Sequence, residues 1–106
     1  MSKRRIRIAP PEELARLIPI VEAKLAALPK IEAGRLSTFD ARRKAADKAL
    51  AELRAEVGAR VNNKWDGCCL RIGGIDVTCT AGGAGAMRNW IGRAERAITA
   101  SAGRAA

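Results

Sequence analysis

Residues 68–80 read CCLRIGGIDVTCT, in which apolar and polar side chains alternate on both sides of a central Gly73-Gly74 pair. Two glycines between alternating runs predict a tight β-hairpin turn, because glycine adopts the positive φ angles that such turns require. A shift of one residue would move every apolar side chain to the polar face, so the pattern predicts a single register. Folding the chain at the turn pairs Ile72 with Ile75, Arg71 with Asp76, Leu70 with Val77, Cys69 with Thr78 and Cys68 with Cys79.

Two amphipathic helices are predicted before this hairpin. The first begins at Pro10 and Pro11, because proline in the first turn of a helix loses no hydrogen bond. Ser37 or Thr38 can cap the second helix, and Gly58 weakens or ends it. The link between them is short, so residues 11–61 are expected to form an antiparallel helical hairpin. The apolar stripes are Leu14, Leu17, Ile18, Val21, Leu25 and Leu28 in the first helix and Phe39, Ala46, Leu50, Leu53, Val57 and Val61 in the second.

The N-terminal residues 1–9 carry four positive charges and no acidic residue. Ile6 and Ile8 alternate with Arg5 and Arg7, a period of two that is typical of a half-buried strand. Residues 4–9 are therefore a candidate edge strand beside the hairpin. The alternative is a disordered basic arm over residues 1–9, and the residues alone leave both interpretations open.

A last helix is predicted from about Ala84 to Thr99, with the tail from Ser101 onward fraying. Hairpin, glycine-rich turn and helix then form one unit over residues 68–99. Residues 1–106 are expected to form a single α+β domain, in which a small antiparallel sheet packs against the helical hairpin and the C-terminal helix. On the last helix Met87, Ile91, Ala94 and Ile98 are expected to face the core, with Trp90 on the flank and Arg88, Asn89, Arg93 and Arg96 outside.

The composition excludes several classes of function. The chain of 106 residues has no histidine, which removes the usual general base and the nucleophile systems that depend on it. Three cysteines alone do not complete an ordinary four-ligand zinc site. Cys68 and Cys79 are expected to be buried, and Cys69 on the polar face is the reactive one. We therefore expect a non-enzymatic protein with no catalytic residues, no metal site and no cofactor.

The glycine-rich segment from Thr80 to Gly85 lacks both the Walker A pattern and the dinucleotide pattern GxGxxG. Its turn at residues 82–85 is either a plain connection or a site for an anion, and the residues leave both open. No apolar run approaches the length needed to cross a bilayer, so we expect a soluble protein of the cytoplasm with no membrane partner.

The net charge of +9 is distributed unevenly along the chain. Residues 11–57 are almost neutral, whereas the surplus lies in residues 1–10 and 58–106. A basic stripe on one side of the fold would suit the phosphates of a nucleic acid, and the competing interpretation is a scattered, solubilising surface. Few aromatic residues are present for base stacking, which favours backbone contact with duplex DNA, with RNA left open. The candidate nucleic-acid-binding residues are Lys3, Arg4, Arg5, Arg7, Arg71, Arg88, Asn89, Arg93 and Arg96.

The segments RIGGI at residues 71–75 and TAGGAGAMRNW at residues 80–90 resemble small accessory proteins of tailed phages and prophages. The resemblance covers about the last third of the chain. It implies a setting in the cytoplasm of a host bacterial cell, where such proteins bind DNA or block a host machine in the manner of anti-CRISPR proteins. Many of those inhibitors are acidic mimics of nucleic acid, whereas this chain is basic.

Two functional hypotheses follow. The first is a nucleic-acid-binding protein that contacts phosphates through its N-terminus and its last helix. The alternative is an inhibitor or adaptor that docks on a host nucleic-acid-processing protein complex. The modest core is also compatible with a homodimer that shares apolar surface.

Overall fold

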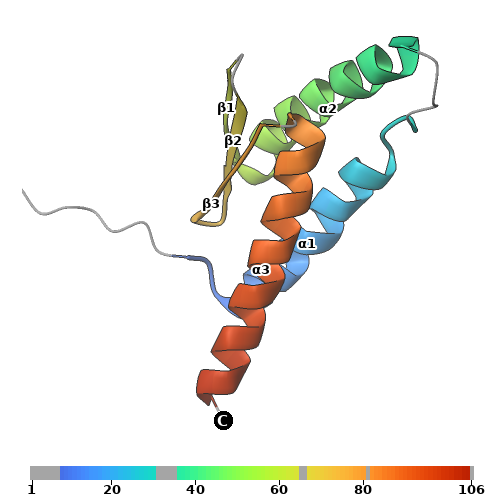
Figure 1. Ribbon diagram of the computed structural model, residues 1–106. Helices are drawn as coiled ribbons and strands as arrows, with labels where there is room; N and C mark the ends of the chain where they lie inside the picture. The colour runs from blue at the N-terminus through green and yellow to red at the C-terminus, as the bar shows by residue number, and fades with distance from the viewer. Residues whose placement is uncertain (1–7, 31–35, 65–66, 81, 106) are drawn as a thin grey trace, which may run out of the picture.

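The computed structural model describes residues 8–30, 36–64, 67–80 and 82–105. The elements follow the order α1 (Pro11–Ala26), α2 (Leu36–Val57), β1 (Arg60–Lys64), β2 (Gly67–Ile72), β3 (Ile75–Cys79) and α3 (Gly83–Ala105). The strands form one antiparallel sheet in the order β1-β2-β3. Figure 1 shows the three labelled helices on one side of this sheet, which confirms the expected α+β arrangement.

The β2–β3 hairpin has the register that the alternation predicts. All the expected cross-strand pairs are present, from Ile72 opposite Ile75 at the turn to Cys68 opposite Cys79 at the far end. Gly73 and Gly74 have φ angles of 56° and 78°, which glycine adopts at little steric cost. The apolar face is buried, because Cys68, Leu70, Ile72, Ile75 and Val77 are at most 7 % exposed.

The strand β1 lies where the sequence analysis placed the end of the second helix. α2 ends at Val57, and Gly58 follows with a φ of 69°, which turns the chain out of the helix. Val61 therefore lies opposite Leu70 of β2 instead of on a helix face. The prediction of a helical hairpin over residues 11–61 was wrong at this end, because a strand of 5 residues shows too little alternation to be distinguished from a helix end.

The edge strand predicted at residues 4–9 is not found in the described part of the chain. Residues 4–7 lie outside the described residues, and Ile8 and Ala9 adopt no regular secondary structure. Ala9 donates its backbone N–H to the carbonyl oxygen of Gly73 at 2.8 Å, which fixes this segment to the hairpin turn. The third strand of the sheet is instead β1, which pairs with β2.

The helix α3 covers the apolar face of the sheet and contacts both β2 and β3. Trp90 is fully buried in the core, and its Nε1–H donates to the carbonyl oxygen of Ile72 at 3.0 Å. This hydrogen bond satisfies the polar indole N–H, so the whole side chain can be buried. The prediction that Trp90 lies on the flank was therefore wrong. The helix also continues to Ala105, where the sequence predicted an end at Thr99 and a fraying tail.

The helix α1 packs mainly against α3, and α2 packs against α1, α3 and β1. Lys24 of α1 joins α1 to α2, because its Nζ lies 3.2 Å from Glu52 Oε1 and 2.8 Å from Glu56 Oε2. The hydrogen bond to Glu56 is the main cause of a raised pKa at Lys24. Among the described positions of α2, the buried ones run from Ala46 to Leu53.

Phe39 was expected on the core face of the second helix, and this was wrong, because its side chain is 51 % exposed. The sequence periodicity continues along the whole helix, but among the described side chains of α2 the buried stripe begins only at Ala46. Which part of a long helix meets the rest of the fold depends on tertiary packing, and the periodicity does not carry that information.

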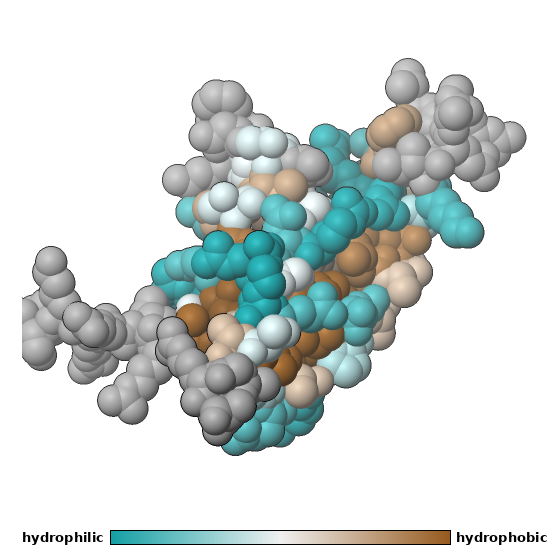
Figure 2. Space-filling view, turned by 60° about the horizontal axis from the view of Figure 1, so that its bottom comes forward, coloured by the Kyte–Doolittle hydropathy of each residue, from teal (hydrophilic) through white to brown (hydrophobic). Residues whose placement is uncertain are grey.

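Some apolar surface remains uncovered. Figure 2 shows hydrophobic side chains in a diagonal band between hydrophilic ones on the face that it presents. A hollow beside α1 and α2 is lined mainly by Pro19, Ile20, Ala23 and Leu28, with the Lys24 ion pairs to α2 at its edge. Nowhere in the described residues does a helix combine the length and the apolar character needed to cross a membrane.

Because α3 packs closely on α2, the effect of a glycine-to-alanine substitution in α3 on the free energy of unfolding should depend strongly on its position. A Cβ added at Gly83 would lie 2.8 Å from Leu50 Cδ1 and 3.3 Å from Ala46 Cβ, and both neighbours are buried. We expect Gly83→Ala to lower the free energy of unfolding by about 1–3 kcal/mol because the core is overpacked.

The matched control is Gly92→Ala in the same helix. A Cβ there meets only Arg96 Nη2 at 3.7 Å within the part of the chain that the structure describes. This variant should be neutral or more stable by about 0.5–1 kcal/mol, because alanine favours a helix over glycine. Urea unfolding measures both, and equal effects of the two substitutions would contradict the close packing at Gly83.

Candidate functional site

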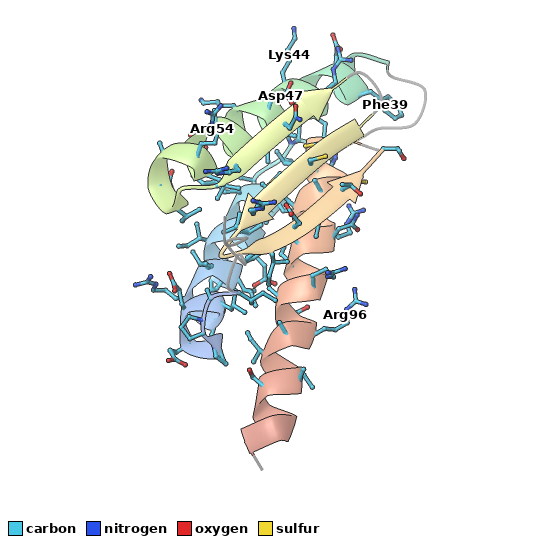
Figure 3. All side chains as sticks on the ribbon, turned by 90° about the vertical axis from the view of Figure 1, so that its left-hand side faces the viewer. Phe39, Lys44, Asp47, Arg54 and Arg96 are labelled. Atoms are coloured by element: carbon cyan, nitrogen blue, oxygen red, sulfur yellow. The ribbon has the colours of Figure 1, made fainter. Side chains whose placement is uncertain are left out.

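The face of the sheet turned away from the helices carries polar side chains in two rows. The strand register places Arg60 opposite Arg71, and Arg71 opposite Asp76. The second row consists of Asn62, Cys69 and Thr78. None of these six side chains is buried, and Figure 3, which looks at the sheet from this side, shows it without a covering helix.

Arg71 and Asp76 form a bidentate ion pair across the hairpin. The Nε of Arg71 donates to Asp76 Oδ1 at 2.9 Å, and its Nη2 donates to Oδ2 at 2.6 Å. The hydrogen bonds from Arg71 lower the pKa of Asp76, and the same bonds raise the pKa of Arg71. At neutral pH both groups are charged, and Arg71 already has an anionic partner within the protein.

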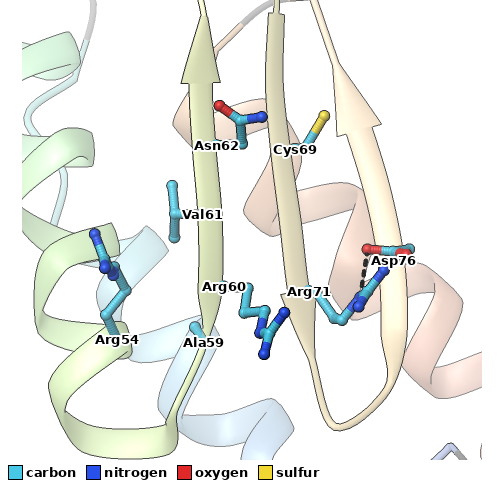
Figure 4. A pocket seen from close by; sticks show the side chains of 8 residues that line it. All are labelled: Arg54, Ala59, Arg60, Val61, Asn62, Cys69, Arg71 and Asp76. Atoms are coloured by element: carbon cyan, nitrogen blue, oxygen red, sulfur yellow. Dashed lines mark hydrogen bonds and ion pairs between the residues drawn. The ribbon is translucent and has the colours of Figure 1, made fainter. Parts of the chain in front are cut away.

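Arg54 of α2 and Arg60 of β1 lie next to this pair and are exposed. Both line an open hollow of about 470 Å³ together with Asn62, Cys69, Arg71 and Asp76 (Figure 4). Within the described part of the chain, neither Arg54 nor Arg60 forms an ion pair or a side-chain hydrogen bond. These two guanidinium groups are therefore free to meet an external anion.

A second group of cations comes from α3. Arg93 and Arg96 line a hollow against β3, together with Asn89, Asp76 and Thr78. Asn89 Nδ2 donates to the carbonyl oxygen of Thr78 at 3.1 Å, which links the helix to the strand. Arg93 and Arg96 are exposed (Arg96 is labelled in Figure 3), and no acidic side chain among the described residues pairs with either.

A third hollow connects the other two. It is lined in part by Cys69, Thr78 and Asn89, of which Cys69 also lines the first hollow and Thr78 and Asn89 the second. The shared residues show that one continuous surface crosses the sheet from α2 to α3. We call this surface the basic face, and define it as Arg54, Arg60, Asn62, Cys69, Arg71, Asp76, Thr78, Asn89, Arg93 and Arg96.

The basic face brings together part of the site predicted from the sequence. Asn89, Arg93 and Arg96 lie on it; Asn89 donates to the carbonyl oxygen of Thr78 and Arg96 to that of Gly92, whereas Arg93 has no partner among the described residues. Arg71 also lies on it but is paired with Asp76. Arg88 is exposed on α3 and lines none of the three hollows. The remaining predicted residues fall outside the described residues: Lys3, Arg4, Arg5 and Arg7.

Arg54 and Arg60 were not among the residues predicted from the sequence. Arg60 lies between Ala59, which is buried, and Val61, which is half-buried, so a period of two was present as a signal. The helical interpretation of Val61 concealed that signal. Arg54 lies on a helix with many charged residues, and only the packing of α2 beside β1 brings it to the sheet.

The cysteines differ sharply in exposure. Cys68 is fully buried, and this burial raises the pKa of its thiol. Cys79 is half-buried, and Cys69 is exposed on the basic face. In the described residues no group of three or more potential metal ligands is found.

The glycine-rich turn before α3 has structural reasons for its glycines. Gly82 has a φ of 97°, and Gly83 packs directly on Leu50 of α2. These two observations explain Gly82 and Gly83 without a ligand.

Comparisons with protein-family models, with curated proteins and with solved structures found no match to this chain.

The cysteine geometry predicts an order of reactivity. Cys69 should react with iodoacetamide at least about tenfold faster than Cys79. Cys68 should react only on unfolding, because a buried thiol is neither accessible nor readily ionised. Mass spectrometry after timed alkylation counts the modified thiols. The Cys69→Ser variant is the control and should show almost no fast modification, whereas fast labelling that persists in this variant would contradict the exposure order.

Proposed function

We propose that this protein is a small, basic, non-enzymatic nucleic-acid-binding protein, of the kind that phages encode, which contacts the phosphate backbone. The observation that carries the proposal is the basic face, where five arginines face one aspartate. Guanidinium groups bind phosphate oxygens in a forked geometry, and four of these five have no acidic partner in the described structure.

The chemistry of the basic face favours backbone contact over base recognition. Aromatic side chains are the main stacking partners of bases, and among the described residues the basic face contains no aromatic side chain. Trp90 is buried in the core, and Phe39 lies near the other end of α2 from Arg54. A surface that neutralises phosphates without stacking suits a duplex, in which the bases are already stacked, and DNA is the first candidate with RNA as the other.

The N-terminal residues Lys3, Arg4, Arg5 and Arg7 are proposed to add to this interface. Ala9 is hydrogen-bonded to Gly73, at the end of the sheet that carries the row of Arg60, Arg71 and Asp76. The four cations precede this anchor closely in sequence, and this proximity in sequence supports their inclusion in the proposed interface.

A second candidate function is the inhibitor or adaptor that docks on a host nucleic-acid-processing complex. The apolar hollow beside α1 and α2, with Ile20 and Leu28 in its lining, is the observation that favours it. Apolar surface contributes to protein interfaces and has no role in phosphate binding. In this case the basic face would meet an acidic protein surface.

The first test measures binding to a labelled duplex of about 20 base pairs by fluorescence anisotropy, across salt concentrations from about 50 to 200 mM. The double variant Arg60→Ala/Arg93→Ala should bind more weakly, and the slope of log K against log salt should fall by about two, because each lost phosphate contact contributes about 0.9.

The matched control is Arg16→Ala/Arg43→Ala, which removes the same charge from α1 and α2. Both arginines are exposed and form i,i+3 ion pairs on their own helices. The control should keep the natural slope. Equal losses of affinity and slope in the two double variants would show that only net charge matters. If the protein binds no duplex or single strand at low salt, the docking function is the remaining candidate.

The second test uses Cys69 as a natural probe of the basic face. Because Cys69 lies between Asn62 and Thr78 at the middle of this surface, a bound duplex should slow its alkylation in proportion to the fraction of protein bound. The rate should recover when high salt releases the duplex. Binding without any protection of Cys69 would place the interface on another part of the molecule.

A further inference from the structure

Asp76 holds a special position on the basic face. Among the described residues it is the only acidic one on this surface, and it lines both the hollow beside Arg54 and Arg60 and the hollow beside Arg93 and Arg96. Its carboxylate is engaged by Arg71 through two hydrogen bonds of 2.9 and 2.6 Å. The central guanidinium of the face is thus occupied. Among the described residues none of the other four arginines forms an ion pair, and Arg96 alone of these four donates a hydrogen bond, from its Nε to the carbonyl oxygen of Gly92 at 3.3 Å.

A phosphate that approaches Arg71 must displace a carboxylate already held in the bidentate geometry that guanidinium prefers. The exchange replaces one forked anion contact by another, so the gain is small. It also leaves the displaced carboxylate beside the phosphate, and two like charges at that distance repel each other. Arg71 therefore gains little from releasing Asp76, whereas Arg60 and Arg93 lose no internal partner when they bind.

We propose that Asp76 is an attenuating residue of the basic face, which keeps Arg71 out of phosphate contact and so limits the strength of nucleic-acid binding. This inference rests on the proposed function. It corrects the role expected of Arg71, because the arginine predicted as a direct contact acts instead as the partner of Asp76. The flanking arginines then carry the phosphate contacts in the natural protein.

The cross-strand ion pair has a second effect, which the test must separate from the first. Opposite charges facing each other across a hairpin stabilise it by a small amount, whatever the surface binds. A purely structural role predicts that loss of Asp76 weakens the fold and leaves binding unchanged or weaker. Attenuation predicts tighter binding with one more phosphate contact.

The closing experiment compares Asp76→Asn with the natural protein in the salt series on the same duplex, with urea unfolding as a check that the variant is folded. The affinity should rise about threefold to tenfold at low salt, and the slope should steepen by about 0.9, because the freed Arg71 reaches one phosphate. The matched control is Asp40→Asn, which makes the same charge change and frees Arg43 from a 2.9 Å ion pair on α2. This control should leave the slope unchanged.

A double variant, Arg71→Gln/Asp76→Asn, tests the natural state directly. If Arg71 makes no phosphate contact while Asp76 is present, removing both charges should leave the slope of the natural protein unchanged. A slope lower by about 0.9 would show that Arg71 contacts phosphate in the natural protein and would overturn the inference. An unchanged slope for Asp76→Asn would overturn it equally.

The failure of this inference is distinguishable from failure of the proposed function. If the natural protein binds duplex and Asp76→Asn does not gain a contact, only the attenuating role of Asp76 is lost. If the natural protein binds no nucleic acid at low salt, the proposed function fails and the inference fails with it.

Discussion

At the turn of the β2–β3 hairpin, Gly73 meets two requirements at once. Its φ of 56° closes the turn and thereby sets the register of the strands. It also leaves room for the start of the fold, because a Cβ at this position would lie 3.3 Å from Ala9 Cβ and from Leu14 Cδ2. The carbonyl of the same residue accepts the N–H of Ala9. One residue therefore fixes both the pairing of the strands and the contact between the hairpin and the beginning of α1, and the division of the sheet into two faces follows from it.

Because side chains alternate between the two faces of a strand, the register also determines where the charged side chains lie. Once Leu70, Ile72 and Val77 face the core, Arg71 and Asp76 must face outward, and β1 adds Arg60 to the same row. Two arginines directly opposite each other repel, and Asp76 offsets only part of this repulsion. A polyanion bound across the row would remove the remaining repulsion. The same placement of Arg60 opposite Arg71 therefore destabilises the free protein and favours a negatively charged ligand.

How far the sequence predicts this structure depends on how local each feature is. The hairpin register follows from neighbouring residues, and it was predicted pair by pair. Trp90 was misplaced because its partner, the carbonyl of Ile72, lies on another element and leaves no mark in the periodicity of α3. Phe39 was misplaced because the apolar stripe continues along α2 beyond the part that packs on the core. The short strand β1 was not predicted, because Val61 continues the apolar spacing of α2 and so fits the pattern of that helix. In the structure Gly58 ends the helix and separates it from β1.

How much of the basic face can be predicted from the sequence likewise depends on whether its residues are brought together locally or by tertiary packing. Its cations come from α2, β1, β2 and α3, so no stretch of sequence displays them together, and Arg54 and Arg60 enter only through packing. A scattered, solubilising surface predicts acids and bases in similar mixture on every side. On α1 and α2 this mixture is present, since Arg16, Lys24 and Arg43 each pair with a glutamate or an aspartate. On the basic face four of the five arginines lack an acidic partner among the described residues, and this imbalance supports the proposed binding surface.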